Sequence, residues 1–117
     1  MQSIENQRPV GGGGYHPVSQ DVIAARLAQY CRKKHGKELP QMAPLHRQQC
    51  VFALIQHCGY TQSQCADLFK IDASVISRDW SQAQFFFSRF VNFRQEITRI
   101  YNYIMYMSRY LNSSSAS

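Results

Sequence analysis

The feature that most constrains the fold is a long hydrophobic repeat near the end of the chain. Apolar residues recur there with spacings of 4, 3, 4, 3, 4, 3 and 4, at Phe86, Phe90, Phe93, Ile97, Ile100, Ile104, Met107 and Leu111. A 3.5-residue period is typical of an α-helix that presents one apolar seam to another helix. The repeat therefore predicts a single straight helix over residues 84–111, about 42 Å long.

Helix signals also dominate the residues that precede this repeat. Ser19, Thr61 and Asp72 each stand before an apolar pattern of helical period and can cap a helix, and Pro44 suits a first helical turn. Alternating strand patterns with hairpin turns are missing. We therefore predict an all-α fold, a small helical bundle over 19–83 followed by the long C-terminal helix. A glycine-interrupted flexible arm (1–18) and a Ser-rich disordered tail (112–117) flank it.

The overall charge favours a polyanionic partner. The chain has 13 Lys and Arg against 7 Asp and Glu, a net charge of +6. The sequence contains no run of 18 apolar residues and no secretory signal pattern, so we expect a cytoplasmic protein without membrane contact. The 4 cysteines lack CxxC spacing and are expected to be reduced thiols.

Residues 61–80 resemble a helix-turn-helix. A small residue, Ala66, stands where two short helices would cross, and Ile71 can fill the turn between them. The positions expected to face the core are all apolar: Cys65, Phe69, Ile76 and Trp80. The opposite face of the second helix is left to solvent.

A wider resemblance covers 47–54 together with 61–83. These residues are similar to the C-terminal DNA-binding domain of the bacterial replication initiator, itself similar to the Trp repressor family. The family's Asp-His-Thr-Thr-Val segment corresponds to residues 72–76, here Asp-Ala-Ser-Val-Ile. Its left-handed turn glycine corresponds to Lys70, where a side chain costs on the order of 1 kcal/mol. The resemblance implies a helical fold that binds duplex DNA.

The expected DNA contacts follow from the chemistry of each side chain. Arg78 would reach a guanine edge or a nearby phosphate, Ser74 and Ser77 would make short hydrogen bonds, and Ala73 would touch a thymine methyl group. Further expected contacts to the DNA backbone are Thr61, Gln62 and Ser63 at a helix start, and Arg47, Lys70, Lys33 and Lys34 as flanking cations. The basic run that holds Lys33 and Lys34 also fits a plain helix C-terminus.

The long seam has two interpretations. In the first, the eight residues of the repeat join two copies of the chain, because a homodimer would bring two reading helices to two DNA half-sites. In the second, the helix folds back on the helix that begins at residue 20 and completes a monomeric bundle.

Other constellations carry little chemistry. Cys31 with His35 and His46 with Cys50 have the four-residue spacing that would allow a zinc site, but buried thiols and histidines at helix ends explain them better. No catalytic arrangement is visible, so we expect no enzyme activity, metal, cofactor or small-molecule substrate.

Together these features predict a sequence-specific protein for double-stranded DNA that acts in transcription or replication as a homodimer. The alternative is a protein-interaction adaptor that binds through the aromatic C-terminal helix.

Overall fold

The computed structural model describes residues 18–116, with the side chains of 18–106. Residues 1–17 of the expected flexible arm lie outside the described range. Every regular element within 18–116 is helical, which confirms the predicted all-α class. The elements are α1 (Gln20–His35), η1 (Leu39–Gln41), α2 (Pro44–Phe52), the π-helix η2 (Ala53–His57), α3 (Gln62–Phe69), α4 (Ala73–Arg89) and α5 (Val91–Ala116).

The helices begin where their local capping signals predict. The Ser19 hydroxyl accepts the N–H of Val22, and Pro44 opens α2. Helix α1 ends at Gly36, whose φ of 68° lets the backbone turn away without strain. These starts and stops depend on contacts within a few residues, so the sequence alone fixes them.

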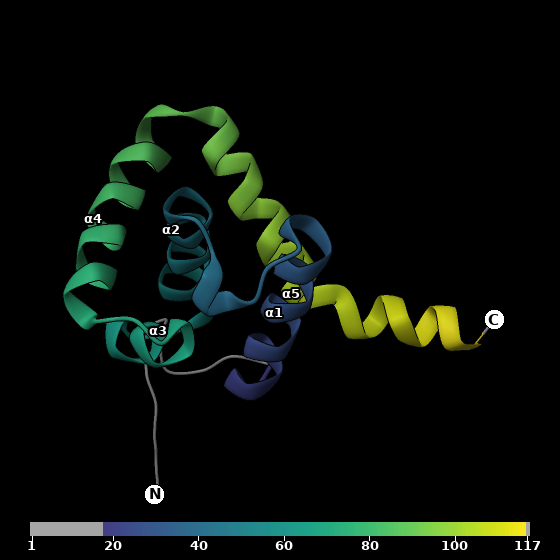
Figure 1. Ribbon diagram of the computed structural model, residues 1–117. Coiled ribbons are helices and arrows are strands. Elements are labelled where there is room, and N and C mark those ends of the chain that lie inside the picture. Colours follow the sequence, from purple (N-terminus) through teal and green to yellow (C-terminus); the bar gives the residue numbers. More distant parts are fainter. Residues whose placement is uncertain (1–17, 117) are drawn as a thin grey trace, which may run out of the picture.

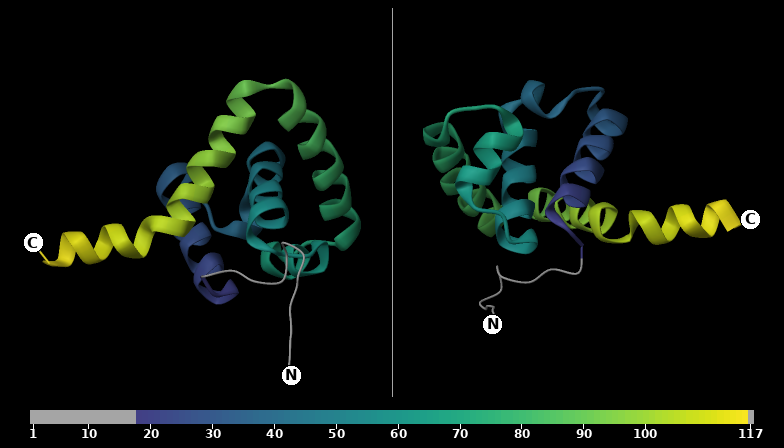
Figure 2. Two further views of the ribbon diagram at one scale, coloured as in Figure 1. Left: turned by 180° about the vertical axis from the view of Figure 1, so that it is seen from behind. Right: turned by 90° about the horizontal axis from the view of Figure 1, so that it is seen from below.

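The helices are arranged around α2. Figure 1 shows α4 and α5 as the two sides of an arch that encloses α2, with α3 across the foot of α4. Helix α2 packs against both sides of the arch. Helix α1 packs against α5, and both views of Figure 2 place it on the other side of α2 from α4. Within the described residues, no helix is both long and apolar enough to cross a membrane.

The predicted single helix over 84–111 is wrong in both of its boundaries. Helix α4 continues from Ala73 to Arg89, and the helix is interrupted at Phe90. Helix α5 then runs from Val91 to Ala116, into the tail expected to be disordered. Phe90 adopts an extended conformation, with φ −121° and ψ 114°. No glycine or proline lies between 73 and 89 to stop α4, and none follows Leu111 to stop α5.

Burial of apolar side chains explains the break. A straight helix would leave the central residues of the repeat in water, whereas the bend folds them onto the bundle. Phe93, Ile97, Ile100 and Ile104 become 0–5% exposed. Each burial contributes roughly 1.5–3 kcal/mol, which outweighs the loss of one helical residue. The Arg94 guanidinium on α5 also donates to the backbone oxygen of Phe87, 2.8 Å away, and so caps the end of α4.

The described part of the repeat therefore serves the fold of one chain, as in the fold-back interpretation. Its four central residues lie in the same core as Ile23, Leu27 and Cys31 of α1. A second chain cannot reach them without unfolding α5 from α1. Of the other seam residues, Phe86 is half-buried and Phe90 is 51% exposed, while the side chains of Met107 and Leu111 lie outside the described range.

Candidate nucleic-acid interface

Helices α3 and α4 are joined by a turn of three residues, 70–72. Thr61 and Gln64 form a reciprocal capping box at the start of α3. Lys70 ends α3 in the left-handed conformation, with φ 55° and ψ 50°, as predicted for the position where the resembling family has glycine. Asp72 then caps α4 by accepting the N–H of Ser74. The left-handed Lys70 and the Asp72 cap thus fix how α4 leaves the turn.

The core-facing side of this pair is as predicted. Cys65, Phe69 and Ile76 are fully buried, and Ala66 is 9% exposed where α3 and α4 pack together. Ile71 and Trp80 are half-buried, and the Trp80 ring lies against Phe52 of α2 with ring centroids 5.4 Å apart. Helix α4 is therefore held by one apolar side.

The opposite side of α4 is open to solvent and carries the residues expected to read DNA. Ala73, Ser74, Ser77 and Arg78 are all exposed. Within residues 18–106, Arg78 makes no ion pair or hydrogen bond. The Ser74 hydroxyl donates to the Asp72 carboxylate, which also lowers the pKa of Asp72. Of the two serine hydroxyls on this face, that of Ser74 can therefore accept a hydrogen bond from a partner, whereas that of Ser77 can donate one.

Sequence reasoning missed the second half of this outer face because it ended the helix at residue 83. Ser81, Phe85 and Arg89 continue the exposed stripe at spacings of three and four residues from Ser77 and Arg78. The Arg89 guanidinium lies over the Phe85 ring, 4.7 Å from its centroid. The missing stop signal between 83 and 89 could have revealed the longer helix.

Arg47 lies in a different place from the one predicted. Instead of flanking DNA, its guanidinium makes a bidentate ion pair with Asp79 of α4, at 2.5 and 3.2 Å. The two side chains are 14% and 4% exposed. A phosphate contact by Arg47 would require breaking a buried ion pair, so we remove this residue from the candidate site.

The two lysines of the basic run are also separate from α4. Both lie on α1, on the other side of α2. The ammonium of Lys34 is paired with the buried carboxylate of Glu96 on α5, and Lys33 is exposed. The structure therefore does not bring Lys33 and Lys34 together with Arg78, and the helix-end interpretation accounts for them.

The start of α3 and the turn remain next to α4. Thr61, Ser63 and Lys70 are exposed, and Gln62 is half-buried. The capping box uses the N–H groups of Thr61 and Gln64, so the helix start offers a phosphate those of Gln62 and Ser63.

The four candidate zinc ligands meet in two pairs. The sulfur atoms of Cys31 and Cys50 are 3.8 Å apart in the core, and the rings of His35 and His46 are stacked with centroids 3.9 Å apart. Burial and the neighbouring His46 lower the pKa of His35. Among the described residues, no three His, Cys, Asp or Glu side chains are grouped to hold a metal ion. The geometry therefore does not support the zinc hypothesis.

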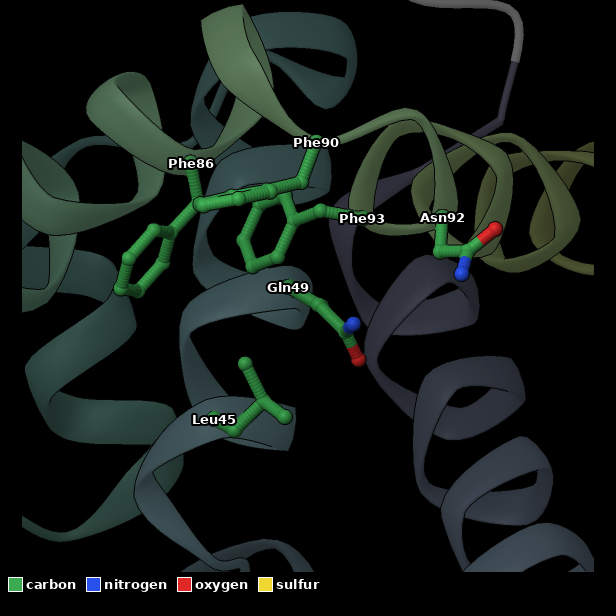
Figure 3. Close-up of a pocket in the computed structure, with 6 residues that line it drawn as sticks. All are labelled: Leu45, Gln49, Phe86, Phe90, Asn92 and Phe93. Carbon is green, nitrogen blue, oxygen red and sulfur yellow. The ribbon is translucent and has the colours of Figure 1, made fainter.

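An open apolar pocket lies under the bend between α4 and α5. It measures about 310 Å³ and is lined by Leu45, Gln49, Phe86, Phe90, Asn92 and Phe93. Figure 3 shows the three phenylalanine rings grouped on one side, with Leu45 and the Gln49 amide facing them from α2. The lining contains no charged side chain and no nucleophile, so it offers a hydrophobic contact and no catalytic group.

Comparison with family models, with curated proteins and with solved structures gives no match for this chain.

Proposed function

We propose that this protein binds double-stranded DNA sequence-specifically, with α3 and α4 as a helix-turn-helix and the outer face of α4 in the major groove. The observation that carries the proposal is the exposed stripe from Ser74 to Arg89. Its first half is small and polar and includes Arg78, which has no partner among residues 18–106, as a groove-reading helix requires.

The distribution of cations supports this assignment. Arg47 and Lys34 are engaged in ion pairs that join two helices, and Arg99 pairs with Glu96 on the same helix, α5. In contrast, Lys70, Arg78 and Arg89, on the turn and on α4, have no acidic partner among residues 18–106, and Arg89 lies over the Phe85 ring. The cations that are not paired within the described residues, and that can therefore bind a polyanion, include those on the proposed reading helix and on the turn before it.

The length of the stripe assigns different roles to its two ends. From Ser74 to Arg89 it spans about 22 Å, which exceeds the major groove width of about 12 Å. Ser74, Ser77 and Arg78 would contact base edges, and Arg89 and Lys70 would reach the phosphates on either side.

The test is selection of bound duplexes from a random pool, followed by titration of the selected duplex and of a random duplex. Arg78→Ala should reduce the discrimination between the two by roughly 1–3 kcal/mol. Arg89→Ala should weaken binding to both duplexes alike. Lys33→Ala, a charge-matched control on α1, should leave both affinities unchanged. Equal losses on the two duplexes for Arg78→Ala would count against a reading role.

A second candidate function is protein–protein interaction at the bend between α4 and α5. Leu45 and Phe90, which line the apolar pocket, are 48% and 51% exposed, and Val91, the residue after Phe90, is 53% exposed. An exposed apolar patch of this kind is typical of an interaction site. This surface replaces the central repeat as the place where a second copy or another protein would bind.

Light scattering separates the two candidates. The interaction function would be favoured if the unmodified protein has a dimer mass and retains no duplex DNA at low salt, and if Phe90→Ser has a monomer mass. Duplex binding that survives Phe90→Ser would favour the DNA-binding function.

A further inference from the structure

Two polar bridges connect α2 to α4. The first is the bidentate ion pair between Arg47 and Asp79. The second is a hydrogen bond of 2.6 Å from the Gln48 amide nitrogen to the Gln82 side-chain oxygen. Consecutive residues of α2 thus meet α4 at two positions three residues apart, which lie on the same side of that helix.

The side chains that flank Asp79 on the core-facing side of α4 are apolar. Ile76 and Ala83, one on each side of Asp79, are fully buried, and Trp80 packs on Phe52. Apolar contacts have no preferred direction, so they tolerate a rotation of the helix about its axis. A bidentate guanidinium–carboxylate pair does not, because both hydrogen bonds require one planar alignment.

Rotation matters here because Arg78 and Asp79 are neighbours on the helix. Successive residues of an α-helix lie about 100° apart around the axis. With Asp79 turned towards α2, Arg78, Ser77 and Ser74 are exposed to solvent. A rotation of one residue in the wrong direction would carry Arg78 to the buried side and remove it from any groove.

We propose that Arg47 and Asp79 are positioning residues that fix the rotation of α4 and thereby determine which side chains face DNA. This inference rests on the proposed function. A buried ion pair contributes little to stability compared with apolar residues of similar size, and its best-attested use is to select one packing register. The pair therefore serves specificity more than folding.

The decisive variant replaces both charges by apolar residues of similar volume, Arg47→Met with Asp79→Leu. We expect this double variant to fold with a thermal midpoint at or above that of the unmodified protein. Its discrimination between the selected and the random duplex should fall about tenfold or more, while its affinity for the random duplex stays within about twofold. The matched control is Arg32→Met with Glu38→Leu. That pair is on the surface, with side chains 50% and 57% exposed, so its replacement should change neither the discrimination nor the affinity for the random duplex.

A second readout does not depend on DNA. In the unmodified protein, nuclear Overhauser effects should join the Trp80 and Phe52 rings, and the amides of α4 should give one set of resonances. In the apolar double variant, these resonances should broaden or double because α4 samples more than one rotation. If the double variant does not fold, Arg47→Lys keeps the charge but loses the planar fork, and the same loss of discrimination is expected.

The possible failures are distinguishable. If the unmodified protein does not discriminate between duplexes, the proposed function fails, and the resonances of α4 alone decide the positioning role. If the folded double variant keeps full discrimination and a single set of α4 resonances, the positioning role is overturned while the proposed function stands.

Discussion

Lys34 on α1 and Glu96 on α5 form an ion pair, with Nζ and Oε1 2.5 Å apart. The carboxylate of Glu96 is buried and also accepts hydrogen bonds from the Tyr30 hydroxyl and from Arg99. The relationship joins the first and last described helices, so it helps to hold the fold-back of α5.

The first prediction concerns the pH dependence of stability. Burial alone would raise the pKa of Glu96, but the hydrogen bonds from Lys34, Tyr30 and Arg99 outweigh it and lower that pKa. A depressed carboxyl pKa stabilises the folded state fully above the unfolded value of about 4.3, and this contribution is lost as the pH falls through the folded pKa. Urea unfolding of Glu96→Gln should therefore show about 1–3 kcal/mol less stability at neutral pH and a flatter loss in acid.

Glu38→Gln is the control for this prediction. It breaks an ion pair of similar type, that between Arg32 and Glu38, but on the surface. Its effect should be below about 1 kcal/mol. Equal effects of the two variants would show that the burial of Glu96 does not matter.

The second prediction concerns the left-handed residue that ends α3. Lys70 has a φ of 55°, in the left-handed region, where the conformational free energy of a residue with a side chain is higher than that of glycine. Lys70→Gly should raise the free energy of unfolding by about 0.5–1 kcal/mol. Gly36→Ala, at a φ of 68° with nothing near the added methyl group, should lower it by a similar amount. Denaturant midpoints that move in the same direction for both variants would contradict the explanation.

The third prediction concerns a buried hydroxyl group. Within the described residues, the Tyr103 hydroxyl is buried without a hydrogen-bond partner, and its ring meets Tyr30 edge-on. Tyr103→Phe should leave stability unchanged or raise it by about 1 kcal/mol, because it removes an unpaired polar group. Tyr60→Phe, which loses a bond of 2.8 Å from the hydroxyl to the Gln20 carbonyl, should lower stability by about 1 kcal/mol. Relative to the unmodified protein, the thermal midpoint should thus fall in Tyr60→Phe and stay the same or rise in Tyr103→Phe.

The fourth prediction concerns thiol reactivity. All the cysteines are buried, and burial raises the pKa of Cys58 and of Cys65 to about 12. Alkylation of the native protein at neutral pH should therefore be slower than that of the urea-unfolded protein by about a thousandfold or more. Mass spectrometry of iodoacetamide-treated samples measures the difference. A cysteine that is alkylated equally fast in both states would contradict the burial.

Local sequence signals predicted the helix starts and the exposed face of α4 well. The caps at Ser19, Thr61 and Asp72 act within three residues, and the left-handed turn at Lys70 follows from the same short range. The helical period predicted the outward position of Ser74, Ser77 and Arg78 once Ile76 and Trp80 were assigned to the core, but it did not show that Arg47 would pair with Asp79 on that side. The break at Phe90 has no such local signal.

The sequence by itself thus determined which segments are helical and which side of each is apolar, because those properties depend on neighbours along the chain. The tertiary structure alone decided where the hydrophobic repeat bends and which cations remain free for a partner. Arg47 and Asp79 are 32 residues apart, and Lys34 and Glu96 are 62 apart. Ion pairs at such separations form only when folding brings the helices together. The net charge of the sequence therefore could not show which lysines and arginines are paired within the protein.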